Sequence, residues 1–177
     1  MVSTKLIGKL FVSRQKEIDL YAKQAEAIQE RVFRKLIQTA AATEWGTKYN
    51  YANICTYDDF KHVPIQQYDD IKGYVDRMRH GEKNILWPGQ VVWYAKSSGT
   101  TNDKSKFIPV SKDGLHHIHY QGGTDAVALY LRSNPQSNFF SGKGLILGGS
   151  HSPNYNLKDS LVGDLSAILI QNINPLV

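Results

Sequence analysis

The chain has 177 residues, of which 41% are hydrophobic and 21% are charged, so a disordered, collagen-like or coiled-coil protein is excluded. Lys and Arg number 21 against 16 Asp and Glu, and the resulting net charge of +5 suits a phosphate-bearing partner without requiring one. Cys55 is the single cysteine, which excludes an internal disulfide and fits a reducing, cytoplasmic location. At this length we expect a single α/β region over residues 1–177.

The first residues do not have the pattern of a targeting segment. Lys5 and Lys9 interrupt the N-terminal apolar run, and no small-residue cleavage site follows, so we expect no signal peptide. No stretch reaches the roughly 18 uncharged apolar residues of a membrane span, and we expect no membrane partner. Nucleic-acid binding is not expected either, because the tyrosines are accompanied by neither an RNP-type motif nor a basic stripe.

Helical patterns dominate the first half of the chain. Apolar residues spaced by three and four predict one long helix over about residues 13–42. Residues 43–53, rich in turn formers and aromatic residues, are expected to form a loop. Tyr-Asp-Asp occurs at 57–59 and again at 68–70, and it predicts two helix starts because Asp caps a first helical turn well. Gly81 is expected to end the second of these helices.

Short apolar runs in the second half predict strands. Residues 91–95 and 107–110 are rich in β-branched and aromatic side chains, and Pro109 favours an edge position for the second run. Residues 144–148 predict another strand, whereas 161–170 are compatible with either a helix or a strand.

One more helix is expected from Ser111 to about residue 131. Gly122 and Gly123 are expected to interrupt it, since glycine costs a helix about 1 kcal/mol relative to alanine. Helices that alternate with short apolar strands indicate the α/β class. The final residues, NINPLV, lack a convincing terminal element, so we expect the sequence to be the first part of a longer protein.

The polar segment after the first predicted strand is the candidate chemical site. It begins with five small residues, four of which carry hydroxyl groups: Ser97, Ser98, Gly99, Thr100 and Thr101. A glycine allows backbone amides to converge on an anion, and Lys104 and Lys106 add positive charge at the far end of the segment. The second glycine of a Walker loop is absent, as is the dinucleotide-binding pattern. On residue chemistry alone, a phosphate-binding loop and a polar surface turn are equally compatible with this segment.

The sequence SSGTTNDKSK at 97–106 resembles the phosphate-binding motif of the adenylate-forming superfamily. Within that superfamily the chain is similar to the Gretchen-Hagen-three (auxin-responsive promoter) family of acyl-acid amido synthetases, especially its bacterial members. Segments 43–49, 63–82 and 145–150 occur in family order around the motif. The resemblance implies an α/β fold, namely the N-terminal part of an adenylate-forming (acyl-CoA synthetase/luciferase-like) large domain with a long N-terminal helix.

The resemblance also implies a reaction. Residues 97–101 would hold the phosphates of ATP, with Mg²⁺ as the accompanying ion, and Lys106 would be the closing, catalytic lysine. A carboxylic acid is first converted to an acyl-adenylate with loss of pyrophosphate, and an amino acid then forms the amide and releases AMP. Both nucleophiles belong to substrates, so the protein needs only to position them and neutralise charge. The remainder of its own longer chain would be its other partner, and the fragment alone is expected to have little activity.

One departure from the family pattern concerns Asn102 and Asp103, which stand where plant members usually have a small residue and glycine. Both residues tolerate left-handed backbone, so the turn can survive. Asp103, however, would place a negative charge near the phosphates, either holding Mg²⁺ or pointing away. A nucleotide-binding module or non-catalytic relative is therefore one alternative, and a purely structural domain is another.

Other polar residues are expected to have structural rather than chemical roles. His116, His117 and His119 have no Cys, Asp or Glu partner at metal-site spacing, so no metal ligands are expected. Cys55 has no histidine nearby in sequence and is not expected to be a nucleophile. Residues 148–150 are equally compatible with the lining of a cleft at a strand end and with a simple turn.

Overall fold

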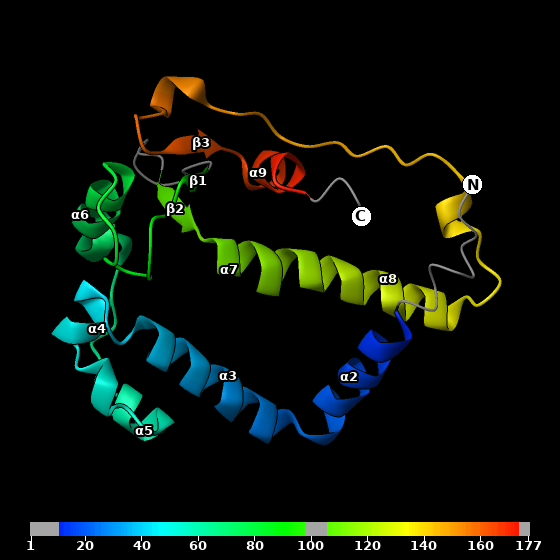
Figure 1. Ribbon diagram of the computed structural model, residues 1–177, viewed down its shortest axis with the longest axis horizontal. Helices are drawn as coiled ribbons and strands as arrows, with labels where there is room; N and C mark the ends of the chain where they lie inside the picture. Colours follow the sequence, from blue (N-terminus) through cyan, green and yellow to red (C-terminus); the bar gives the residue numbers. More distant parts are fainter. Residues whose placement is uncertain (1–10, 98–105, 174–177) are drawn as a thin grey trace. The chain divides into compact units, whose positions relative to one another are not determined.

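The computed structural model describes residues 11–97 and 106–173 (Figure 1). The chain divides into two compact units, one made of Met1–Glu30 with Asp113–Leu147 and the other of Arg31–Lys112 with Gly148–Val177. Both lie within the single α/β region expected over residues 1–177, and that expectation stays a prediction. No helix in the described ranges is both long and apolar enough to cross a membrane.

The first unit is helical. Helix α2 (Val12–Lys23) packs against α8 (Gln121–Ser133). Two ion pairs join the helices: Arg14 Nη2 contacts Asp125 Oδ2 at 2.9 Å, and Arg132 Nη1 contacts Asp19 Oδ1 at 2.6 Å. The short 3-10 helix η3 (Phe139–Ser141) completes the unit, and the ring of Phe140 stacks on that of Phe11 at 6.3 Å.

The helical stretch expected over 13–42 is confirmed, but it forms two helices. Helix α3 (Ala25–Ala40) begins one residue after Gln24, whose φ of −133° and ψ of 34° leave the helical region. No glycine or proline lies at the break, and the apolar spacing continues across it. The sequence therefore gives no indication that the helix ends there.

The helix expected from Ser111 is also confirmed, with its irregularity in another place. It starts as α7 (Lys112–Gly114), continues as the π-helical element η2 (Leu115–Tyr120) and runs into α8. Gly122 and Gly123 lie inside α8, so the expected interruption at these glycines is wrong. The π-helical turn lies in the LHHIHY segment instead.

The second unit carries a three-stranded sheet in the order β2-β1-β3 (Figure 1). Strands β1 (Trp93–Lys96) and β2 (Phe107–Val110) are antiparallel, with Lys96 opposite Phe107. Strand β3 (Leu161–Gly163) pairs with β1 in parallel and is followed by α9 (Leu165–Gln171). The strands expected at 91–95 and 107–110 are therefore confirmed, and β2 lies at the edge of the described sheet, as Pro109 indicates.

Residues 161–170 contain both a strand and a helix. Strand β3 ends before Asp164, and helix α9 begins after it. The strand expected at 144–148 is wrong, since residues 143–150 have no regular secondary structure. Leu145 and Leu147 are each 86% exposed. An apolar run becomes a strand only when a neighbouring strand satisfies its backbone groups, and no strand in the described ranges pairs with this run.

The core of the second unit forms where α6 (Tyr68–Arg79) packs on the sheet. Val75 and Met78 contribute from the buried face of the helix, and Tyr94 and Val162 contribute from the strands. Tyr94 is completely buried; its hydroxyl donates to the Val91 carbonyl at 3.1 Å, and burial raises the pKa of the phenol. The three-and-four apolar spacing in α6 is the pattern that predicts this arrangement.

Short helices occupy the segment expected to be a loop. Residues 43–53 form α4 (Glu44–Lys48) and the 3-10 helix η1 (Tyr51–Asn53), so the loop expectation is wrong. Thr43 supplies the missing helix signal, because its hydroxyl accepts from the Gly46 amide at 2.9 Å. A further 3-10 helix, η4 (Pro153–Tyr155), precedes β3.

Both Tyr-Asp-Asp sequences begin helices, as expected: α5 (Tyr57–Phe60) and α6. The capping residues differ from the expected Asp. Thr56 caps α5, and Asp59 returns the bond by accepting from the Thr56 amide at 2.8 Å. Hydrogen bonds with the side chain and the backbone of Thr56 lower the pKa of the Asp59 carboxyl. At the other end of α6, Gly81 adopts a φ of +93°, which ends the helix as expected.

Candidate functional site

Two described residues bound the candidate phosphate segment. Ser97 follows β1 and Lys106 precedes β2, whereas Ser98, Gly99, Thr100 and Thr101, like Asp103 and Lys104, lie outside the described residues. The Ser97 amide donates to the Lys106 carbonyl at 3.0 Å, and the Lys106 amide donates to Ser97 Oγ at 3.2 Å. The antiparallel pairing of β1 and β2 therefore continues one residue beyond the strands and brings both ends of the segment together.

The groups on these two residues suit an anion. Ser97 Oγ accepts from the Lys106 amide, which leaves its own O–H able to donate. The ammonium of Lys106 lies 5.4 Å from the centre of the Tyr68 ring. No carboxylate in residues 11–97 or 106–173 forms an ion pair with it. The Ser97 hydroxyl and the Lys106 ammonium, which has no carboxylate partner among the described residues, are donors of the kind that bind phosphate groups.

Helix α6 holds the start of β2 at two points. The Tyr68 hydroxyl accepts from the Phe107 amide at 2.9 Å and donates to the Phe107 carbonyl at 3.4 Å. The guanidinium of Arg79 lies 3.8 Å from the centre of the Phe107 ring, and its Nη2 donates to the Tyr155 carbonyl at 2.6 Å. The residue that follows Lys106 is thereby fixed through both its backbone and its side chain.

Lys96 occupies the end of β1. Its ammonium lies 4.1 Å from the centre of the Tyr155 ring, and that ring is 5.8 Å from the ring of Phe107. Each lysine at this end of the hairpin is therefore paired with a different tyrosine. Sequence reasoning missed both tyrosines, because they lie 38 and 59 positions away from their lysines (106 minus 68 and 155 minus 96).

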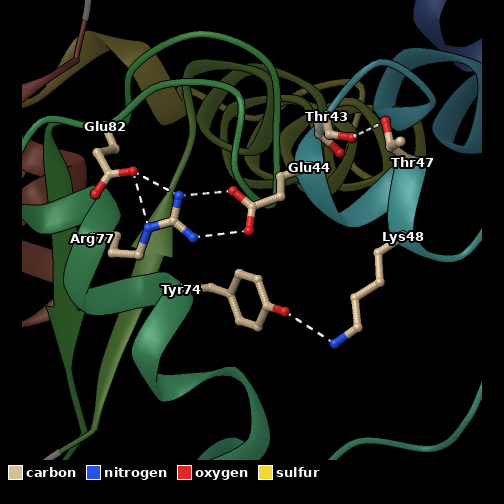
Figure 2. Close-up of polar contacts among 7 residues, drawn as sticks. All are labelled: Thr43, Glu44, Thr47, Lys48, Tyr74, Arg77 and Glu82. Carbon is tan, nitrogen blue, oxygen red and sulfur yellow. Dashed lines mark hydrogen bonds and ion pairs between the residues drawn. The ribbon is translucent and has the colours of Figure 1, made fainter.

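Arg77 joins α6 to α4 (Figure 2). Its Nη1 and Nη2 donate to the two carboxylate oxygens of Glu44 at 2.8 and 2.7 Å, and its Nε and Nη2 donate to Glu82 at 2.9 and 2.7 Å. The hydrogen bonds from Arg77 lower the pKa of both carboxyls, and they raise the pKa of the guanidinium in turn. Segments 43–49 and 63–82, which carry part of the family resemblance, thus contact each other directly.

A second contact in Figure 2 joins the same two helices. The Lys48 ammonium donates to the Tyr74 hydroxyl at 3.0 Å, and this bond raises the pKa of the lysine. The rings of Trp45, Tyr49 and Tyr74 lie 5.4, 5.1 and 5.3 Å from the ammonium. With Arg77, this cluster fixes the position of α6, the helix that contacts the end of the candidate segment.

The glycine in the 43–49 segment has a packing role. A Cβ on Gly46 would lie 2.1 Å from the Ala40 carbonyl oxygen, so only glycine fits there. The Thr43 hydroxyl, buried with 1% exposure, donates to the same carbonyl at 2.7 Å. Thr47 Oγ1 donates to the Thr43 carbonyl at 2.9 Å (Figure 2). The chain leaves α3 and enters α4 through this compact turn.

Residues 148–150 have neither a turn nor regular secondary structure, and they pack on the start of α9. The Gly149 amide donates to Ser166 Oγ at 2.8 Å, and the Ser150 amide donates to Asp164 Oδ2 at 2.9 Å. A Cβ on Gly149 would lie 2.2 Å from Asp164 Oδ2, which accounts for the glycine. The simple turn expected as one alternative does not form, and a role in lining a cleft stays a prediction.

The remaining polar candidates are dispersed. Within the described ranges no group of three or more His, Cys, Asp or Glu side chains could hold a metal ion. His116, His117 and His119 lie on η2, and Cys55 is exposed. An open pocket of about 310 Å³ lies beside η1 and α5, but neither Ser97 nor Lys106 lines it.

Comparison with known proteins identifies the family to which the chain belongs. The model of the GH3 family N-terminal domain matches residues 14–175. The chain belongs to the GH3 family, so the family resemblance read from the sequence is confirmed. The further resemblance to bacterial members stays a prediction.

Named relatives share part of the sequence. The chain is 31% identical over 106 residues to indole-3-acetic acid-amido synthetase GH3.8 of Oryza sativa subsp. indica, covering 59% of this chain and 18% of that protein. It is 27% identical over 99 residues to jasmonoyl-L-amino acid synthetase JAR4 of Nicotiana attenuata, covering 55% and 17%. The aligned region is therefore less than a fifth of either relative.

Solved structures show the fold. The GH3.15 acyl acid amido synthetase superposes with a TM-score of 0.74 at 18% identity, over 97% of this chain and 30% of that one. The AtGH3.15 acyl acid amido synthetase in complex with 2,4-DB gives a TM-score of 0.74 at 22% identity, over 98% and 30%. The expected fold, the N-terminal part of a larger adenylate-forming domain, is confirmed.

Proposed function

We propose that this chain supplies the phosphate-binding part of an ATP-dependent acyl-acid amido synthetase, which joins a carboxylic acid to an amino acid. The observation that carries the proposal is the pair of hydrogen bonds between Ser97 and Lys106, which joins the two ends of the family-like motif. Membership of the GH3 family supports the same conclusion. The relatives compared are named as synthetases that conjugate indole-3-acetic acid or form jasmonoyl amino acids.

The proposed reaction has two steps. A carboxylate oxygen attacks the α-phosphorus of ATP, and the bond to pyrophosphate breaks. The amine of an amino acid then attacks the activated carbonyl and loses a proton, and AMP leaves. Neither step needs a nucleophile from the protein, so the residues of this chain act by binding and by stabilising charge.

Lys106 and Ser97 have separate roles in this proposal. The Lys106 ammonium neutralises charge that develops on the phosphates as pyrophosphate leaves. The Ser97 hydroxyl donates to a phosphate oxygen while its lone pair holds the Lys106 amide. Ser98, Gly99, Thr100 and Thr101 are proposed to supply the remaining donors, and Mg²⁺ would accompany the phosphates. A cytoplasmic location is proposed with them, since ATP and free amino acids are abundant there.

The test uses the full-length protein with a panel of carboxylic acids and amino acids. We expect mass spectrometry to find an amide, with AMP and pyrophosphate released in equal amounts, only when acid, amine, ATP and Mg²⁺ are all present. ATP binding without turnover on any acid would favour a non-catalytic nucleotide-binding relative. Absence of ATP binding would favour a structural domain and contradict the proposal.

A further inference from the structure

Tyr68 makes two different contacts with consecutive residues of the hairpin. Its hydroxyl is bonded to the backbone of Phe107, at 2.9 Å from the amide and 3.4 Å from the carbonyl. Its ring faces the ammonium of Lys106 at 5.4 Å. A single side chain therefore both fixes the backbone beside the candidate lysine and offers a ring to its charged end.

The ring contact addresses a physical difficulty of lysine. A lysine has four rotatable side-chain bonds, so holding its ammonium in one place costs rotamer entropy. An aromatic face within about 6 Å attracts the ammonium but leaves its N–H groups able to bond elsewhere. A carboxylate in the same place would hold the lysine more tightly and compete with a phosphate. A tyrosine ring orients the charge without neutralising it.

Tyr68 is itself held firmly. It is the first residue of α6, whose Val75 and Met78 are 0% and 2% exposed in the core. Arg77 of the same helix is bonded to Glu44 and Glu82. The position of the ring is therefore set by a helix anchored through its core face and through its ion pairs, independently of any ligand.

We propose that Tyr68 is a positioning residue for phosphate binding, its ring orienting the Lys106 ammonium and its hydroxyl fixing the strand that follows. The inference rests on the proposed function, because it takes Lys106 as the residue that meets the phosphates. Tyr68 acts through Lys106 and does not itself contact ATP. Its ring and its hydroxyl can be removed separately, which makes the two roles distinguishable.

The experiment measures the dissociation constant of ATP with Mg²⁺ by calorimetry, together with urea unfolding, on the full-length protein. The variants are Tyr68→Phe, Tyr68→Leu, Lys106→Met and the double variant Tyr68→Leu/Lys106→Met. Tyr155→Leu is the matched control, since it removes the ring beside Lys96. Should Tyr68→Leu fail to fold, Tyr68→Gln takes its place, because it also lacks a ring but keeps a hydrogen-bonding end.

Tyr68→Leu is expected to weaken ATP binding about three- to thirtyfold when Lys106 is present and less than about twofold in the Lys106→Met background. Tyr68→Phe keeps the ring, so its ATP binding stays within about twofold of wild type, whereas its urea midpoint falls because the Phe107 amide loses its acceptor. Tyr155→Leu is expected to leave ATP binding unchanged.

Three results would overturn the inference. Equal weakening by Tyr68→Leu in both backgrounds would show a merely structural role, and no weakening in either would show no role. Wild-type protein that binds no ATP would refute the proposed function and this inference with it. Wild-type binding combined with either of the first two results refutes the positioning role alone.

Discussion

The hydroxyl of Ser97 accepts a hydrogen bond from the backbone N–H of Lys106 at 3.2 Å. One side chain therefore joins the two strands at the loop end of the hairpin and still has a proton to donate. Because the two residues bound the family-like motif, this bond links the fold directly to the proposed phosphate site. It also makes Ser97 a residue whose loss affects structure and binding together.

Replacing Ser97 with alanine removes both the acceptor for Lys106 and the donor for a phosphate. We expect Ser97→Ala to weaken ATP binding about five- to thirtyfold and to lower the free energy of unfolding by about 0.5–1.5 kcal/mol. Ser97→Thr keeps the hydroxyl and serves as the control. Calorimetry and urea titration of the full-length protein measure the two effects. Equal ATP affinity in wild type and Ser97→Ala would remove this residue from the site.

Lys106 is expected to matter most in the first step of the reaction. In Lys106→Met the charge on the departing pyrophosphate loses its counter-charge, so acid-dependent pyrophosphate release should slow by about 10²–10³. Lys96→Met, on the other strand at the same end of the hairpin, is the matched control and should stay within about threefold. The rate is measured with saturating ATP. Similar slowing in both variants would mean that the hairpin as a whole, and not Lys106, supports the reaction.

Gly46 and Gly73 form a contrasting pair of glycines. A Cβ on Gly46 would meet the Ala40 carbonyl oxygen at 2.1 Å, whereas one on Gly73 would have no atom within 4 Å. Gly46→Ala should therefore lower the free energy of unfolding by about 1–3 kcal/mol. Gly73→Ala, inside α6, should raise it by about 0.4–1 kcal/mol. Urea unfolding of the two variants side by side tests the packing of the turn, and a stabilising Gly46→Ala would show that it is wrong.

The Glu44–Arg77 pair predicts a pH dependence of stability. Arg77 lowers the pKa of the Glu44 carboxyl below its ordinary value of 4.5. A carboxyl with a depressed pKa stabilises the fold above its ordinary pKa, and this contribution is lost as the pH falls through the depressed value. Glu44→Gln should thus lower the thermal midpoint by about 1–3 °C at pH 7, since the pair is exposed.

The comparison of wild type with Glu44→Gln can be controlled by changing the pH and the salt concentration. The difference between wild type and Glu44→Gln should shrink as the pH falls below 4.5, and also when salt is raised at pH 7. A difference that stayed constant from neutral to acidic pH would mean that the carboxylate charge of Glu44 does not contribute, and that the variant acts by another route.

The sequence predicts those parts of the fold that depend on local patterns. Apolar spacing in α6, the β-branched and aromatic runs at 91–95 and 107–110, and Gly81 at a helix end all act within a few residues, so the sequence shows them. The break at Gln24 carries no such signal. Residues 144–148 have the composition of a strand, but strand formation requires a partner that local composition does not reveal.

The position of the candidate site could be predicted from the sequence, but the contacts that hold its residues in place could not. Hydroxyls, a glycine and lysines directly after a strand point to Ser97 and Lys106. The contacts of Tyr68 with Phe107 and of Glu44 with Arg77 join residues that are 39 and 33 positions apart. Such contacts follow from the way helix α6 packs, which sequence spacing does not encode.

The most direct test of the proposed function is the exchange of labelled pyrophosphate into ATP by the full-length protein, measured with a carboxylic acid and no amine. The first step then runs in isolation and in both directions. We predict exchange with at least one acid of a broad panel, and its loss in Lys106→Met. Exchange absent with every acid, or undiminished in Lys106→Met, would contradict the claim that the hairpin joining Ser97 to Lys106 holds the phosphates of ATP.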